Sequence, residues 1–193
     1  MPLLPLVAVG TLALASHASR RSGSAGFLVD EGHVGGHWGS QGAGVLLSTG
    51  RQILLMYRSD LVDYEPHTWG VPGGAVPVDS DTGEPDDLIA AAAREVREEA
   101  GIGFGRERLA RHLAGRTVFR SGSFRFTTFI ARLPESVTRE HIRLNWESED
   151  AGWFTPEELL DLELHPGVRF TLNEAWDTVF APDAPGAGLR GRI

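Results

Sequence analysis

The segment 85–100 constrains the fold of this chain more than any other. It combines a proline near its start, Asp86 and Asp87 where a helix would begin, an alanine-rich middle and Gly101 directly after it. Proline and acidic residues favour the first turn of a helix, and glycine favours the position after its end. The pattern therefore predicts a helix over 85–100. At about 100° per residue, one stripe of this helix is apolar and would pack on a sheet: Ile89, Ala92, Ala93, Val96 and Ala100.

Three glutamates lie beside this apolar stripe. Glu95 and Glu99 stand one helical turn apart, and Glu98 lies further round on the same side. Like charges at this spacing repel one another, so cationic groups must offset them. Arg94 and Arg97 supply part of that charge, and a divalent metal could supply the rest. The competing interpretation is a solvated helix face with ordinary Arg–Glu pairs.

Composition narrows the classes of function. The net charge is −8, from 26 acidic residues and 18 Lys and Arg, so nothing predicts binding to nucleic acid or to an anionic membrane. A surplus of carboxylates suits a hard divalent cation instead. The chain has no cysteine, which excludes disulfides, zinc–thiolate sites and thiol nucleophiles.

The length suits one domain with an extension. The apolar run 3–15 contains a proline, has no Lys or Arg before it and is too short to span a bilayer. We therefore expect a cytoplasmic protein, with export through an atypical signal as the alternative. A Ser- and Gly-rich linker follows this run. The predicted parts are an N-terminal extension over 1–36, a folded domain over 37–181 and a flexible tail over 182–193.

Strand patterns flank the central helix on both sides. Apolar runs at 43–48 and 51–58, separated by a Thr-Gly pair, predict a hairpin. Further strands are predicted at 117–119, 124–131 and 151–154, a loop at 65–81, and helices opening at Thr155 and covering 170–180. This order of elements predicts an α/β sandwich with a mixed β-sheet.

Two motifs in the chain resemble those of Nudix hydrolases. The run 94–102 is REVREEAGI, which matches the second half of the Nudix box at every fixed position. The run 69–74 is WGVPGG, which is similar to the segment that precedes the box. The resemblance covers residues 37–180 and implies an α/β/α sandwich with a mixed β-sheet. It does not assign a subfamily.

The loop between these motifs departs from the family pattern. In the family, a glycine, five residues, a glutamate and seven residues precede the Arg-Glu pair. Here nine residues separate Gly74 from Glu84, and nine more separate Glu84 from Arg94. The insertion lies around 77–83. The first carboxylate of the box is Glu84 by local pattern but Asp86 by counting back from Arg94, so both stay candidates.

The resemblance also implies a reaction. It is the hydrolysis of a pyrophosphate bond, by attack of water at phosphorus, in a nucleoside diphosphate linked to another moiety. Hard cations prefer oxygen ligands, so the expected cofactor is Mg²⁺, with Mn²⁺ as a substitute. The implied metal ligands are Glu95, Glu98, Glu99 and the backbone carbonyl of Gly74. Glu98 and Glu99 would also be catalytic, and Arg94 would pair with a box glutamate and hold it in place.

Candidates outside the box complete the predicted site. Glu147 is the candidate for an additional ligand or general base, because family members often recruit a carboxylate from this later loop. Glu149 and Asp150 compete with it for this role. The predicted substrate-binding residues are Arg58 for phosphates and Trp69 and Phe126 for a stacked base. Each has a structural alternative, namely a solvated strand-end arginine and core aromatics.

Several substrates stay open at this point. They are a nucleoside triphosphate or oxidised nucleotide, a sugar nucleotide, and a dinucleoside polyphosphate. Isomerases of isopentenyl diphosphate need a catalytic cysteine and are excluded. The alternative from another class is a nucleotide-sensing module that binds without hydrolysis. The expected partner is a small nucleotide, with no nucleic acid and no membrane span, and a homodimer is left open.

Overall fold

The computed structural model of the chain describes residues 41–78, 81–82, 85–139 and 142–193. The predicted extension over 1–36 and the candidate Glu84 lie outside the described residues. Within the described part, no helix is long and apolar enough to cross a membrane.

The described residues form one mixed β-sheet. Its strands are β1 Gln41–Ser48, β2 Ile53–Arg58, β3 Trp69–Gly70, β4 Gly73–Ala75, β5 Leu113–Ser121, β6 Phe124–Arg132 and β7 Ser148–Phe154. Five strands follow the order β3-β2-β1-β6-β5, while β4 pairs with β1 and β7 pairs with β2. β1 runs parallel to β6, and the other pairs are antiparallel. The predicted mixed sheet is confirmed.

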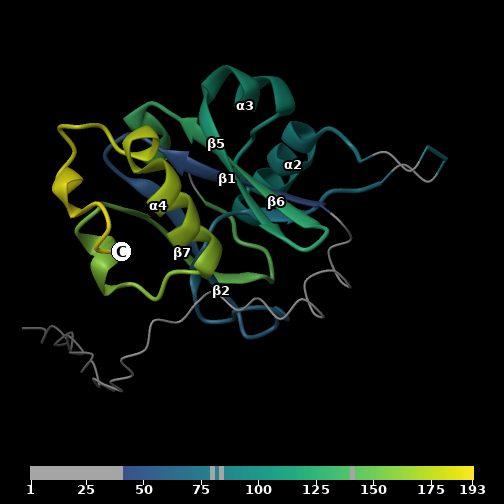
Figure 1. Cartoon of the computed structure of the whole chain (residues 1–193), viewed down its shortest axis with the longest axis horizontal. Helices are drawn as coiled ribbons and strands as arrows, with labels where there is room; N and C mark the ends of the chain where they lie inside the picture. Colours follow the sequence, from purple (N-terminus) through teal and green to yellow (C-terminus); the bar gives the residue numbers. More distant parts are fainter. Residues whose placement is uncertain (1–40, 79–80, 83–84, 140–141) are drawn as a thin grey trace, which may run out of the picture.

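Helices cover both faces of this sheet (Figure 1). Alternate residues of a strand point to opposite faces, and β1 follows this rule: Val45 and Leu47 belong to the core under α2 Leu88–Ala100, whereas Leu46 belongs to the core under α4 Pro166–Val179. The short helix α3 Arg106–His112 contacts α2 on the first of these faces. The expected α/β/α sandwich is therefore confirmed.

The central helix begins later than predicted. It starts at Leu88, because the Asp87 side chain accepts hydrogen bonds from the backbone N–H groups of Ile89 and Ala90 and so caps the helix. It ends at Gly101, whose φ of 67° is the left-handed conformation that favours glycine. The prediction of a helix here is confirmed, but its predicted start at 85 is wrong by three residues.

Other differences involve short elements. The stretch 65–81, predicted as a loop, contains β3 and β4, and α3 was not predicted. Strands of two and three residues have no repeating pattern, and pairing with β1 and β2 makes them strands. The helix expected at Thr155 is a 3₁₀ turn over Glu158–Asp161, and the helix expected at 170–180 already begins at Pro166.

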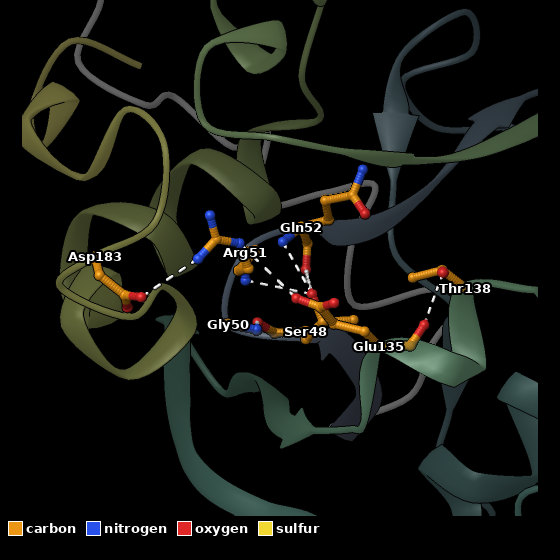
Figure 2. A network of polar contacts seen from close by, with 8 residues as sticks. Ser48, Gly50, Arg51, Gln52, Glu135, Thr138 and Asp183 are labelled. Atoms are coloured by element: carbon orange, nitrogen blue, oxygen red, sulfur yellow. Dashed lines mark hydrogen bonds and ion pairs between the residues drawn. The ribbon is translucent and has the colours of Figure 1, made fainter.

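The C-terminal residues 182–193, predicted as a flexible tail, pack against the domain. Trp176 Nε1 of α4 donates a hydrogen bond to the carbonyl of Ala187 at 3.0 Å, and Ala184 is buried. At the turn between β1 and β2, Arg51 forms an ion pair with Asp183 at 3.3 Å, and Figure 2 shows its guanidinium directed at that carboxylate. The tail is thus joined to the turn that ends β1.

Ser48, the last residue of β1, connects the same turn to α4. It is fully buried, its hydroxyl donates to the carbonyl of Val179, and its oxygen accepts from the N–H of Gly50 at 2.8 Å. One side chain therefore satisfies two buried backbone groups.

We predict that Ser48→Ala destabilises the protein. Two buried backbone groups lose their partner, which costs about 1–3 kcal/mol of unfolding free energy. The matched control is Ser123→Ala in the exposed turn between β5 and β6, where a change within about 0.5 kcal/mol is expected. Urea unfolding measures both variants, and equal midpoints for the two would contradict the prediction.

Candidate active site

The last turns of α2 place two glutamates against the paired glycines of β4. Glu99 is only 4% exposed, and its Oε1 accepts a hydrogen bond from the N–H of Gly73 at 2.9 Å. A Cβ on Gly74 would stand 2.8–2.9 Å from the carboxylate atoms of Glu95. No side chain fits there without moving that carboxylate. Gly74 is therefore required by the close approach of the Glu95 carboxylate, whereas a Cβ on Gly73 would meet the Cα of Gly44 at 2.9 Å and the Phe126 ring at 3.0 Å.

Burial makes this cluster electrostatically unfavourable for negative charge. The pKa of Glu99 is raised to about 8, mainly by burial and also by the charges of Glu147 and Glu95, while the Gly73 N–H and Arg58 oppose the shift. Burial also raises the pKa of Glu95, against the effect of the neighbouring Arg94. The site thus favours either bound protons or an added cation.

Arg94 links the helix to β4 and orients Glu95. Its Nη2 donates to Glu95 Oε1 at 2.6 Å and to the carbonyl of Ala75 at 3.3 Å. Its Nε lies 3.7 Å from Glu98 Oε2, and Arg97 Nη2 lies 3.7 Å from the other oxygen of Glu98. The Glu98 side chain is half exposed, so of the three box glutamates it is the one most open to solvent.

The structure brings Glu147 to the same cluster from a distant part of the sequence. Its backbone carbonyl accepts from the N–H of Ser59 at 2.8 Å, which places it beside the end of β2. Its negative charge raises the pKa of both Glu95 and Glu99. The competing candidates Glu149 and Asp150 are exposed on β7. The geometry therefore favours Glu147 over these two.

Arg58 also reaches this region. Its Nε and Nη2 both donate to the carbonyl of Tyr64, at 3.2 and 2.8 Å. The side chain is largely buried, which lowers the pKa of Arg58, and its positive charge acts on Glu99 and Glu147. Arg58 is thus not a freely solvated strand-end arginine. It compensates part of the negative charge and holds the loop after β2.

The two aromatic candidates are packed in the fold. The Trp69 ring lies 4.7 Å from that of Phe154 and 5.3 Å from that of Tyr57, measured between centroids. The Phe126 ring covers the Cα side of Gly42, where a Cβ would come within 2.5 Å of it. Both rings are half buried. Their packing is what the structural alternative expected, and their contact with a base stays a prediction.

The two ends of the inserted loop are joined at residues that the structure describes. Val78 and Pro85 form an antiparallel bridge at its base, and the N–H of Asp86 donates to the carbonyl of Pro77 at 2.9 Å. Asp86 is exposed. Since Glu84 lies outside the described residues, the first box carboxylate stays open between the two.

The donor atoms fit a hard divalent cation by their chemistry. Glu95, Glu99 and Glu147 are oxygen donors whose mutual repulsion a cation would relieve. Within the described part of the chain, no three His, Asp or Glu side chains are already drawn together as a metal cluster. Glu95 is held by Arg94 instead. Binding a cation would therefore require these side chains to turn toward it.

A polar pocket lies elsewhere, at the opposite end of β1. Arg51, Gln52, Glu135 and Thr138 line it, and Figure 2 shows them around the turn after β1. Arg51 is already paired with Asp183 and Glu135. The pocket is therefore not part of the glutamate site.

Sequence reasoning missed one functional group in this site. The Gly73 N–H holds Glu99, although Gly73 was recognised only as part of a motif. The paired glycines were the available signal, because a backbone that accepts no Cβ usually approaches another group closely.

Comparison with known proteins identifies the class of protein to which this fold belongs. The NUDIX domain model matches residues 40–173. The chain belongs to the Nudix family.

Relatives and solved structures add detail. A Mycobacterium tuberculosis protein named "Putative 8-oxo-dGTP diphosphatase 3" is 34% identical over 152 residues, which cover 74% of this chain and 64% of that protein. The chain thus spans a little under two thirds of that relative. The crystal structure of RenU, a Nudix hydrolase from M. smegmatis, is 25% identical with a TM-score of 0.51, covering 71% of this chain and 83% of RenU. A MutT protein from Methanosarcina mazei Go1 shares the fold at 23% identity and a TM-score of 0.51, over 71% of this chain and 91% of the other.

We predict that Glu99→Gln stabilises the metal-free protein in a pH-dependent way. The pKa of Glu99 is raised from 4.5 to about 8 on folding, so wild-type stability falls as pH rises through that range. Glutamine carries no charge and keeps an acceptor for Gly73. The variant should exceed wild type by about 1–4 kcal/mol at pH 8 and by much less at pH 5.

The control for this measurement is Glu174→Gln, an exposed residue of α4. Urea unfolding with a chelator present, at both pH values, gives the comparison. A difference between Glu99→Gln and wild type that does not change with pH would contradict the prediction.

Proposed function

We propose that this chain is a divalent-metal-dependent pyrophosphohydrolase that cleaves a nucleoside diphosphate linked to another moiety. The observation that carries the proposal is the buried Glu99, held by the Gly73 N–H beside Glu95 and Glu147. A nearly buried carboxylate surrounded by two others is costly unless the site has a use for it. In a Nudix domain that use is metal binding.

Each residue has a defined part in this proposal. Glu95, Glu98, Glu99 and the carbonyl of Gly74 would hold Mg²⁺, or Mn²⁺ in its place. When bound, such a cation neutralises phosphate charge and lowers the pKa of a coordinated water. Glu147 would accept the proton from the attacking water, and the effect of its charge on the pKa of Glu99 supports this role.

The arginines of the site support these glutamates. Arg94 keeps the Glu95 carboxylate against the glycine pair through its 2.6 Å hydrogen bond. Arg58 offsets negative charge near Glu99, and from the end of β2 it would also attract substrate phosphates. Substrate phosphates would therefore lie near positive charge at this site, although the net charge of the chain is −8.

The first substrate to test is an oxidised purine nucleoside triphosphate. The support is the relative named for 8-oxo-dGTP, at 34% identity. Trp69 of β3 and Phe126 of β6 are the proposed residues that contact the base. Sugar nucleotides and dinucleoside polyphosphates are the other substrates to include in the same assay.

We predict Mg²⁺-dependent turnover on at least one member of a panel of 8-oxo-dGTP, dGTP, ADP-ribose and diadenosine tetraphosphate. Glu99→Gln should lower kcat/KM on that substrate by about 10²- to 10⁴-fold, because it weakens metal binding at the reacting phosphate. Chromatography identifies the products, and ¹⁸O-water shows the attacked phosphorus.

Glu174→Gln again serves as the control and should keep wild-type kcat/KM. If wild type and Glu99→Gln behave identically on every substrate, hydrolysis at this site is refuted. Nucleotide binding without turnover would then support the sensing module.

A further inference from the structure

The segment 145–147 precedes β7 and holds its glutamate in an unusual way. The Asn145 side chain makes two hydrogen bonds to Glu147: its Oδ1 accepts from the Glu147 N–H at 3.0 Å, and its Nδ2 donates to Glu147 Oε1 at 3.2 Å. Asn145 and Glu147 are both half buried, whereas the Trp146 between them is 62% exposed. The first and third side chains of the segment therefore share the side that faces the domain.

The backbone of this segment is anchored as well. The Glu147 carbonyl accepts from the N–H of Ser59 at 2.8 Å, and Ser59 is buried at the end of β2. The position of the Glu147 Cα is thus set by the sheet. What remains to be fixed is the direction of its side chain.

Electrostatics alone would turn that side chain away. The charge of Glu147 acts unfavourably on Glu95 and Glu99, and a half-buried glutamate has rotamers that lead to solvent. A neutral hydrogen-bond donor on one carboxylate oxygen holds the side chain against this repulsion. Unlike a cationic side chain, it does not compete with a metal ion or a proton for the carboxylate. Asn145 supplies such a donor and leaves the second oxygen of Glu147 available.

We propose that Asn145 is a positioning residue, which holds the Glu147 carboxylate toward Glu95 and Glu99 through its Nδ2 hydrogen bond. This inference rests on the proposed function, in which Glu147 takes the proton from the attacking water. In this proposal Asn145 acts only through the Glu147 carboxylate. Its effect is on kcat, because a misdirected base slows the chemical step without weakening substrate binding.

The test compares variants that keep the turn but lose the donor. Asn145→Ser and Asn145→Asp both retain an oxygen that accepts from the Glu147 N–H. The Ser hydroxyl lies one bond short of the position of Nδ2, and Asp has no donor and adds a repelling charge. We expect kcat to fall by about 10-fold for Ser and up to about 100-fold for Asp, with KM within about twofold and unchanged melting temperatures.

Controls separate this proposal from a purely structural role and from the proposed function. Asn173→Ser, on the exposed face of α4, should keep wild-type kcat. In a Glu147→Ala background, Asn145→Ser should cause no further loss, because it acts only through that carboxylate.

Three results would overturn the proposal. The first is wild-type kcat in both Asn145 variants. The second is a loss of kcat that follows a drop in melting temperature. The third is that Asn145→Ser lowers kcat in the Glu147→Ala background by the same factor as in wild type. Full activity of Glu147→Ala alone would refute the role given to Glu147 in the proposed function, whatever the Asn145 variants do. A slow Glu147→Ala with fast Asn145 variants would refute only the positioning role.

Discussion

The contact between Glu99 and the N–H of Gly73 is the interaction on which the rest of the site depends. It joins the last turn of the central helix to a three-residue strand, and it buries a carboxylate where two other glutamates are close. Since such burial opposes folding, the surrounding structure must stabilise it. Packing of the alanine and valine stripe of α2 on the sheet supplies that stability, with Val96 and Ala100 fully buried.

The two ends of β1 make different contacts. Its first half carries Gly42 and Gly44, which pair with β4 and leave room for the glycine pair and the Phe126 ring. Its far end carries Ser48, which is bound to the C-terminal end of α4. The candidate site thus lies beside the half of β1 that carries two glycines, and the connection to α4 lies at its other end. A change at one end need not disturb the other.

Arginines give the site its charge balance. Arg94, whose side chain is one third exposed, bonds to Glu95 and bridges to β4, and Arg58 bonds to a loop carbonyl while its charge acts on Glu99. Asn145 adds a neutral contact where a further cation would neutralise the base. These contacts orient the glutamates without a metal, and in the proposed function a cation would supply further positive charge.

The sequence by itself determined the central helix, the glutamate edge and the family, because helical periodicity, capping residues and a nine-residue motif are all local patterns. It also predicted the five longer strands, since each carries an apolar run of its own. It did not determine β3, β4 or the start of α2, because strands of two or three residues exist only through their pairing and a cap depends on one side chain. Only the tertiary structure brought Glu147 and Arg58 near Glu99, since they are 48 and 41 positions distant from it in the chain. The pairing of β2 with β7 sets Arg58 beside the segment that carries Glu147 and its partner Asn145, and α2 packs on the same sheet.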